Sequence, residues 1–157
     1  MDYLVRTNGK SEDFIRLVAQ LDAELAIIDG EDHAFYAELN KTDKIKHVIT
    51  AHTNGWAMGC GALKRYNAKT MEIKRMYITP EYRGKGQATI ILQRLEEWAW
   101  ELDYARVILE TSHKQPDAIA LYKKNGYTVI PNYGQYKGVD MSICFEKKLP
   151  PPRQWFI

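Results

Sequence analysis

One continuous stretch, MEIKRMYITPEYRGKGQA, constrains the fold more than any other part of the chain. Its first part, Met71–Ile78, is rich in β-branched and aromatic residues, which predicts a strand. Pro80 ends this strand, because proline has no N–H to donate to a sheet and biases Thr79 towards an extended backbone. Beyond the glycines, apolar residues recur at three- and four-residue spacing, which predicts a helix from Thr89. The stretch therefore encodes a strand, a glycine-punctuated turn and a helix in immediate succession.

The turn Arg83–Ala88 has the properties of a phosphate-binding site. Gly84 and Gly86 have no Cβ, so the backbone can bend sharply and approach another molecule closely. The first amides of the following helix have no partner within the helix and lie at the positive end of its dipole. Arg83 and Lys85 add formal positive charge. Because the dinucleotide spacing G-x-G-x-x-G and the pattern G-x-x-x-x-G-K-[ST] are both absent, a plain connection and a different phosphate ligand, such as a nucleotide, remain alternatives.

The rest of the chain predicts a sheet covered by helices. Further strands are predicted at Tyr3–Arg6, Ile45–Thr50, Trp56–Leu63, Arg106–Thr111, Tyr127–Ile130 and Met141–Phe145, and helices from Ser11, over Asp32–Leu39 and from Pro116. Asn54-Gly55 is typical of a type I′ hairpin. The strands before the glycine-rich turn should run antiparallel. The strand–helix–strand unit around that turn should instead hold two parallel strands joined by a right-handed crossover.

Composition limits the classes of protein that this chain can belong to. With 157 residues, 45% of them hydrophobic, residues 1–157 are expected to form a single domain with a real core. A net charge of +2 on scattered basic residues argues against nucleic acid as a partner. Cys60 and Cys144 have neither metal-ligand spacing nor a disulfide framework, so buried thiols are expected, and no metal. No signal peptide or membrane-spanning run is visible, so a cytoplasmic protein without membrane contact is expected.

Two motifs resemble those of the Gcn5-related N-acetyltransferase (GNAT) family. Arg83, Gly86 and Ala88 occupy the fixed positions of the family's [Q/R]-x-x-G-x-[G/A] acyl-CoA loop. Residues 118–127, AIALYKKNGY, resemble its A-x-x-L-Y-x-x-x-G-[FY] signature. The resemblance implies the acyl-CoA N-acyltransferase fold, an α/β (α+β) architecture whose central mixed sheet has two splayed parallel strands and is flanked by helices. It also implies an acyltransferase, namely an acetyl-CoA-dependent N-acetyltransferase.

Carried over to this sequence, the resemblance implies acetyl-CoA as the cosubstrate. Its pantetheine arm would lie between the splayed strands and pair with the backbone of Met76, Tyr77 and Ile78, as an added strand does. The diphosphate would be bound by the loop residues Arg83, Gly84, Lys85, Gly86, Gln87, Ala88 and Thr89. Gln115 stands where many relatives have an asparagine that contacts the cofactor, so that contact is not carried over.

The implied reaction is direct attack of an amine on the thioester. An alkyl amine, with a pKa of about 10, is mostly protonated at neutral pH, so a group must accept its proton. Glu72, four residues before Met76, matches the general base of the histone-acetylating members. The alternatives are a surface glutamate or one in a salt bridge, for example with Lys74, and a water chain or His113 as the base.

Two further groups complete the expected chemistry. A backbone amide near Ile78 could stabilise the oxyanion. Tyr122 fills the family's tyrosine position and is expected to protonate the departing thiolate, although an aromatic packed in the core would leave the same pattern. A covalent route through Cys60 is disfavoured, because no activating base stands beside it.

The acceptor is expected to be an amine on a small molecule or a peptide, bound by the N-terminal helices and the loop Tyr133–Tyr136. Tyr36, Tyr133 and Tyr136 are candidate lining residues, with simple packing as the alternative. Asp29, Glu31, Asp32 and Glu38 make the early region acidic, which favours a cationic amine, although ordinary solvated helix charges explain them too. A non-catalytic acyl-CoA sensor is the alternative function. The apolar tail residues Trp155 and Phe156 could dock on the body or on a second copy, which leaves a homodimer open.

Overall fold

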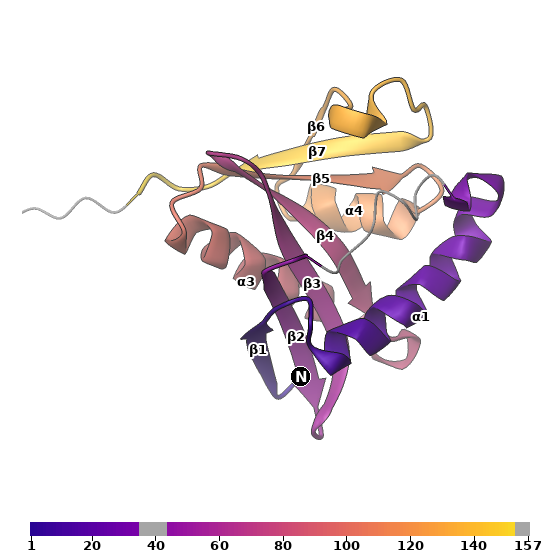
Figure 1. Cartoon of the computed structure of the whole chain (residues 1–157), viewed down its shortest axis with the longest axis vertical. Helices are drawn as coiled ribbons and strands as arrows, with labels where there is room; N and C mark the ends of the chain where they lie inside the picture. Colours follow the sequence, from indigo (N-terminus) through magenta and orange to yellow (C-terminus); the bar gives the residue numbers. More distant parts are fainter. Residues whose placement is uncertain (35–43, 153–157) are drawn as a thin grey trace, which may run out of the picture.

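The computed structural model describes residues 1–34 and 44–152, which form one mixed sheet of seven strands with helices on both faces (Figure 1). The strand order is β1-β2-β3-β4-β5-β7-β6. The strands are β1 (Tyr3–Thr7), β2 (His47–Thr53), β3 (Trp56–Asn67), β4 (Thr70–Ile78), β5 (Arg106–Ser112), β6 (Thr128–Ile130) and β7 (Ser142–Lys148). The helices are α1 (Glu12–Asp29), α3 (Gln87–Glu101) and α4 (Pro116–Lys124), with single 3-10 turns η1 (Gly30–Asp32), η2 (Pro80–Tyr82) and η3 (Gly134–Tyr136).

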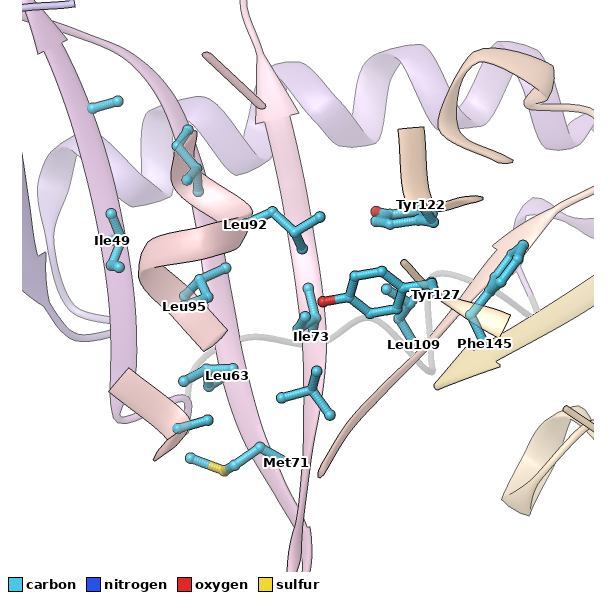
Figure 2. Packing of buried hydrophobic residues seen from close by; sticks show 14 of the residues in the cluster. Ile49, Leu63, Met71, Ile73, Leu92, Leu95, Leu109, Tyr122, Tyr127 and Phe145 are labelled. Carbon is cyan, nitrogen blue, oxygen red and sulfur yellow. The ribbon is translucent and has the colours of Figure 1, made fainter. Parts of the chain in front are cut away.

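Two apolar clusters pack against opposite faces of the sheet. Helix α1 covers one face, where Phe14 and Leu17 pack on Val48 and its neighbours. Helices α3 and α4 cover the other face, and Figure 2 shows part of this larger cluster around Ile73. Neighbouring strand residues such as Val48 and Ile49 belong to different clusters, because successive side chains of a strand point to opposite faces. The sheet is therefore buried on both sides, and α1 lies on the face opposite to α4.

Local capping and turn chemistry explain where the elements begin and end. The hydroxyl of Ser11 accepts a hydrogen bond from the Phe14 amide, so Ser11 is the N-cap of α1 and the helix begins where it was predicted to begin. Both hairpin residues, Asn54 and Gly55, have positive φ angles, as a type I′ turn requires. Gly126, two residues after the last residue of α4, has a φ of +87°, so a glycine in the left-handed region ends that helix.

Strands β4 and β5 are parallel neighbours over a short distance only. Their pairing runs from Thr70 opposite Arg106 to Glu72 opposite Ile108. Beyond this point β4 continues along β3 as far as Ile78, whereas β5 continues along β7. Figure 1 shows the two strands diverging. The expected splay between two parallel strands is thus confirmed, and it leaves one edge of the second half of β4 without a neighbouring strand in the described chain.

Several predicted boundaries were wrong by a few residues. Strand β3 runs on to Asn67 rather than ending at Leu63, because its last residues, although exposed, pair with the start of β4. Helix α3 begins at Gln87 and not at Thr89. The helix predicted over Asp32–Leu39 and the tail aromatics lie largely or wholly outside the described residues. Within the described ranges, no helix combines the length and the apolar character needed to cross a membrane.

Candidate active site

A cleft of about 680 Å³ opens beside the unpaired edge of β4, between α1, the glycine-rich loop and α4. We call it the loop cleft. Nine of the ten predicted cofactor-binding residues line it, namely Met76, Tyr77, Ile78, Arg83, Gly84, Gly86, Gln87, Ala88 and Thr89. The tenth, Lys85, is not part of this lining, and its ammonium group lies 5.8 Å from the ring centre of Tyr82. The strand and the loop that the sequence singled out therefore face one common space.

The loop presents a cradle of open backbone. Gly84 and Gly86 have φ angles of +78° and +82°, and no atom outside the neighbouring residues lies within 4 Å of a Cβ built on either. Gly86 is the N-cap of α3, and no side chain caps this helix end, so its first amides are available to a ligand. Lys114 and Lys124 add positive charge to the cleft lining. A small anionic group such as a phosphate fits this cradle.

A second, smaller cavity adjoins the loop cleft on the side of the sheet covered by α1. Three carboxyl groups, those of Asp29, Glu72 and Glu110, line it together with Lys74 and Arg75. We call it the carboxyl pocket. The two cavities share the lining residues Leu21, Met76, Gln115, Ala118 and Tyr122. A molecule in the loop cleft and one in the carboxyl pocket would therefore meet beside Tyr122.

Glu72 is buried in the carboxyl pocket and already has close polar neighbours. The hydroxyl of Tyr133 donates a 2.5 Å hydrogen bond to one carboxylate oxygen, and the Lys74 ammonium lies 4.0 Å from the other. The hydroxyl of Tyr136 lies 3.4 Å from the same ammonium group. Desolvation lowers the pKa of Lys74. Glu72 thus belongs to a structured polar cluster.

Glu110 is a functional candidate that the sequence analysis missed. It lies on β5 and accepts a 2.6 Å hydrogen bond from the buried Ser142 hydroxyl. Burial raises the pKa of its carboxyl group to about 7, and the negative charges of Glu72 and Asp29 act in the same direction. The hydrogen bond from Ser142 and the charge of Lys74 oppose this rise only in part. Glu110 can therefore take up or release a proton near neutral pH.

Tyr122 reaches the junction of the two cavities from α4. It is buried among aromatic rings, with ring centres 5.7 Å from Tyr127 and 6.0 Å from Phe145. Burial, assisted by the charge of Glu110, raises the pKa of its phenol above the ordinary value of 10.0. The phenol therefore stays protonated at neutral pH and can act as a hydrogen-bond donor.

The structure does not bring every alternative candidate to the cavities. His113 is exposed and lines neither of them. Cys60 is fully buried, and burial raises the pKa of its thiol to about 12, so the thiolate needed for a covalent route does not form near neutral pH. Of the early acidic residues, Asp29 lines the carboxyl pocket, whereas Glu31 and Asp32 are exposed. Tyr36 and Glu38 lie outside the described residues.

Comparisons with known proteins give the family. The profile of the acetyltransferase (GNAT) family matches residues 15–127. The chain is 27% identical over 148 residues to an IAA acetyltransferase of Azospirillum brasilense, covering 93% of this chain and 97% of that protein. A crystal structure of a protein described as an acyl-CoA N-acyltransferase from Klebsiella pneumoniae superimposes with a TM-score of 0.79 at 29% identity, over 94% of this chain and 97% of that one.

A third relative was crystallised with coenzyme A. It is the PaiA N-acetyltransferase of Thermoplasma acidophilum, with a TM-score of 0.57 and 24% identity over 64% of this chain and 59% of that one. At this identity the likeness concerns the fold. Together with the family match, the two aligned relatives identify the class of enzyme: the chain belongs to the acetyltransferase (GNAT) family and is an acetyl-CoA-dependent acyltransferase.

Proposed function

We propose that the protein transfers the acetyl group of acetyl-CoA to a primary amine that is bound in the carboxyl pocket. The observation that carries this proposal is the junction of the two cavities beside Tyr122. One cavity has an open strand edge and a phosphate cradle, which suit pantetheine and diphosphate. The other has carboxyl groups, which suit an ammonium group. The continuous sheet from β1 to β6 also supports one domain over residues 1–157.

In this proposal, coenzyme A occupies the loop cleft. The outward-facing backbone of Met76 and Ile78 pairs with the pantetheine amides, and the amides around Gly86 bind the diphosphate. The thioester then lies near Tyr122, where the amine can reach it. The coenzyme A bound to the Thermoplasma relative supports this assignment, because that chain shares the fold.

The amine must lose a proton before or during its attack on the thioester carbon. We propose Glu110 as the proton acceptor, because its carboxyl group lines the carboxyl pocket and titrates near neutral pH. Glu72, the residue expected from the family pattern, is the second candidate, acting directly or through a water. An N–H on the open side of β4, such as that of Met76, which lines both cavities, stabilises the oxyanion, and Tyr122 donates to the departing thiolate sulfur.

The charges of the carboxyl pocket support a cationic acceptor. Arg75 is paired with Asp22 at 2.5 Å, so it adds little net charge to the pocket. The three carboxyl groups then share the pocket with one lysine, Lys74. Desolvation lowers the pKa of this lysine, which weakens its positive charge. A second ammonium group on the acceptor would offset the remaining negative charge.

A thiol-release assay with acetyl-CoA tests the proposed function. The panel contains n-butylamine, 1,4-diaminobutane and 4-aminobutanoate, which have the same length and differ in the charge at the far end. We expect turnover of the amines, with the diamine about tenfold above the monoamine in kcat/KM and the carboxylate lowest. Calorimetric binding of coenzyme A without thiol release from any amine would instead favour the non-catalytic sensor.

The phosphate cradle makes a separate prediction. Gly86→Ala is expected to weaken coenzyme A binding about tenfold by calorimetry, because an alanine at a φ of +82° is strained and its methyl group occupies the cradle. Gly138→Ala is the matched control. Gly138 has a φ of +77° and equally open surroundings, but it lines neither cavity. Equal weakening by both variants would mean that the effect reflects general strain and not the loop.

A further inference from the structure

Arg83, the loop residue expected to bind the diphosphate, forms an ion pair with Glu24 of α1 across the loop cleft. One terminal nitrogen of Arg83 lies 3.0 Å and 2.9 Å from the two carboxylate oxygens of Glu24. The Tyr77 hydroxyl lies 3.3 Å from one of these oxygens, and the guanidinium carbon lies 5.4 Å from the centre of the Tyr77 ring. Glu24 and Arg83 both line the loop cleft, so their contact spans the space that the proposed function assigns to coenzyme A.

Arg83 also forms a hydrogen bond with the backbone of β4. Its Nε donates a 2.8 Å hydrogen bond to the Ile78 carbonyl. The Thr79 amide bonds to Met58 on β3, and alternate residues of a strand direct their backbone groups to opposite sides, so Ile78 faces away from β3. The Ile78 carbonyl is therefore one of the groups that pantetheine would pair with. Arg83 therefore contacts both the Glu24 carboxylate and a carbonyl group on the strand edge that pantetheine would occupy.

The charges explain why a bound diphosphate should replace Glu24 as the partner of Arg83. A guanidinium group binds phosphate oxygens in the same planar geometry that it uses for a carboxylate. Glu24 and a diphosphate cannot both lie against Arg83 without mutual repulsion of like charges. The pair is only partly buried, with 46% of the Arg83 side chain and 35% of the Glu24 side chain exposed, so breaking it costs little.

We propose that Glu24 is a positioning residue of the coenzyme A site, which holds Arg83 until the diphosphate replaces the Glu24 carboxylate. The exchange keeps the arginine neutralised in both states. Glu24 therefore competes with the diphosphate. This inference rests on the proposed binding of coenzyme A in the loop cleft.

Calorimetric titration of Glu24→Gln with coenzyme A tests the exchange. We expect the Kd to fall about two- to fivefold relative to the wild-type chain, the range of a partly exposed ion pair. Pantetheine, which has no diphosphate, should bind both proteins equally. Raising the salt concentration should narrow the difference for coenzyme A, because salt screens charges at the surface. A purely structural role of Glu24 would not depend on the diphosphate or on salt.

Two control variants separate exchange from a general loss of negative charge. Glu81→Gln removes the same charge from the exposed turn η2, two residues before Arg83, and should change the Kd less than Glu24→Gln. In an Arg83→Gln background, Glu24→Gln should have no further effect, because the competing partner is gone.

Three results would overturn the exchange alone: unchanged or weaker coenzyme A binding by Glu24→Gln, equal tightening in the Arg83→Gln background, or equal tightening for pantetheine. A wild-type chain that fails to bind coenzyme A at all would overturn both the exchange and the proposed function.

Discussion

Replacing Tyr122 with phenylalanine is expected to lower kcat about 100-fold, with a much smaller change in KM for acetyl-CoA. The departing thiolate develops charge in the transition state, and a positioned donor at such a charge contributes about two orders of magnitude. The Tyr122 ring packs against Tyr127 and Phe145, and phenylalanine preserves this packing, so the protein should fold normally.

The direction of the Tyr122 pKa shift indicates how this residue acts. An alkyl thiol loses its proton near pH 8.5, whereas burial raises the pKa of the Tyr122 phenol above 10.0. Complete proton transfer to the thiolate is therefore uphill, and the main contribution should be a hydrogen bond to the sulfur. A thioester whose leaving thiol is more acidic needs the hydrogen bond from Tyr122 less. Tyr122→Phe should therefore lose less activity with such a thioester than with acetyl-CoA.

Tyr127→Phe provides the control for Tyr122→Phe. Its hydroxyl donates a 2.7 Å hydrogen bond to Glu96, away from both cavities, so removing it should lower the melting temperature and change kcat little. If Tyr122→Phe kept full turnover with acetyl-CoA and a good acceptor, the tyrosine would be a packing residue only.

The parts of the fold that could be predicted from the sequence are those with local causes. Gly84, Gly86 and Pro80 act through backbone conformations that depend on their own residue type, and each marks a boundary close to where the chain changes structure. Asn54-Gly55 likewise specifies a hairpin without help from distant residues. The splay of β4 and β5 came from the family resemblance, since no local pattern encodes it.

The groups that the sequence analysis missed depend on contacts between distant segments. Glu110 belongs to no sequence motif, and its raised pKa arises from burial and from the nearby charge of Glu72 on β4. Glu24 belongs to no sequence motif either, and only the fold places it against Arg83, 59 residues away. For Glu110, a carboxylate directly after the apolar run Val107–Leu109 was the one available signal.

Replacing Glu110 with glutamine is expected to lower kcat at pH 7.5 by about 100- to 1,000-fold, because a positioned base contributes about two to four orders of magnitude. Glutamine has nearly the same shape and can still accept the hydrogen bond from Ser142, so loss of folding should not account for the change. Glu72→Gln is the matched variant in the same pocket. It should cost less, because Glu72 is already engaged by Tyr133 and lies near Lys74.

The pH profile separates Glu110 from the other groups of the carboxyl pocket. A base acts when it is deprotonated, so kcat at saturating amine should rise with pH through about 7 and then level off. The charges of Glu72 and Asp29 raise the pKa of Glu110, and Lys74 and the Ser142 hydroxyl lower it. Glu72→Gln should therefore move the inflection to lower pH.

Deprotonation of the acceptor amine in solution would give a similar pH profile of kcat, so amines of different pKa are compared. If Glu110 is the base, the inflection stays near pH 7 for each amine and disappears in Glu110→Gln. If the reaction instead needs an amine that is already neutral in solution, the inflection follows the pKa of the amine and survives the substitution. In that case Glu110 would serve to bind the acceptor and would have no part in the proton transfer.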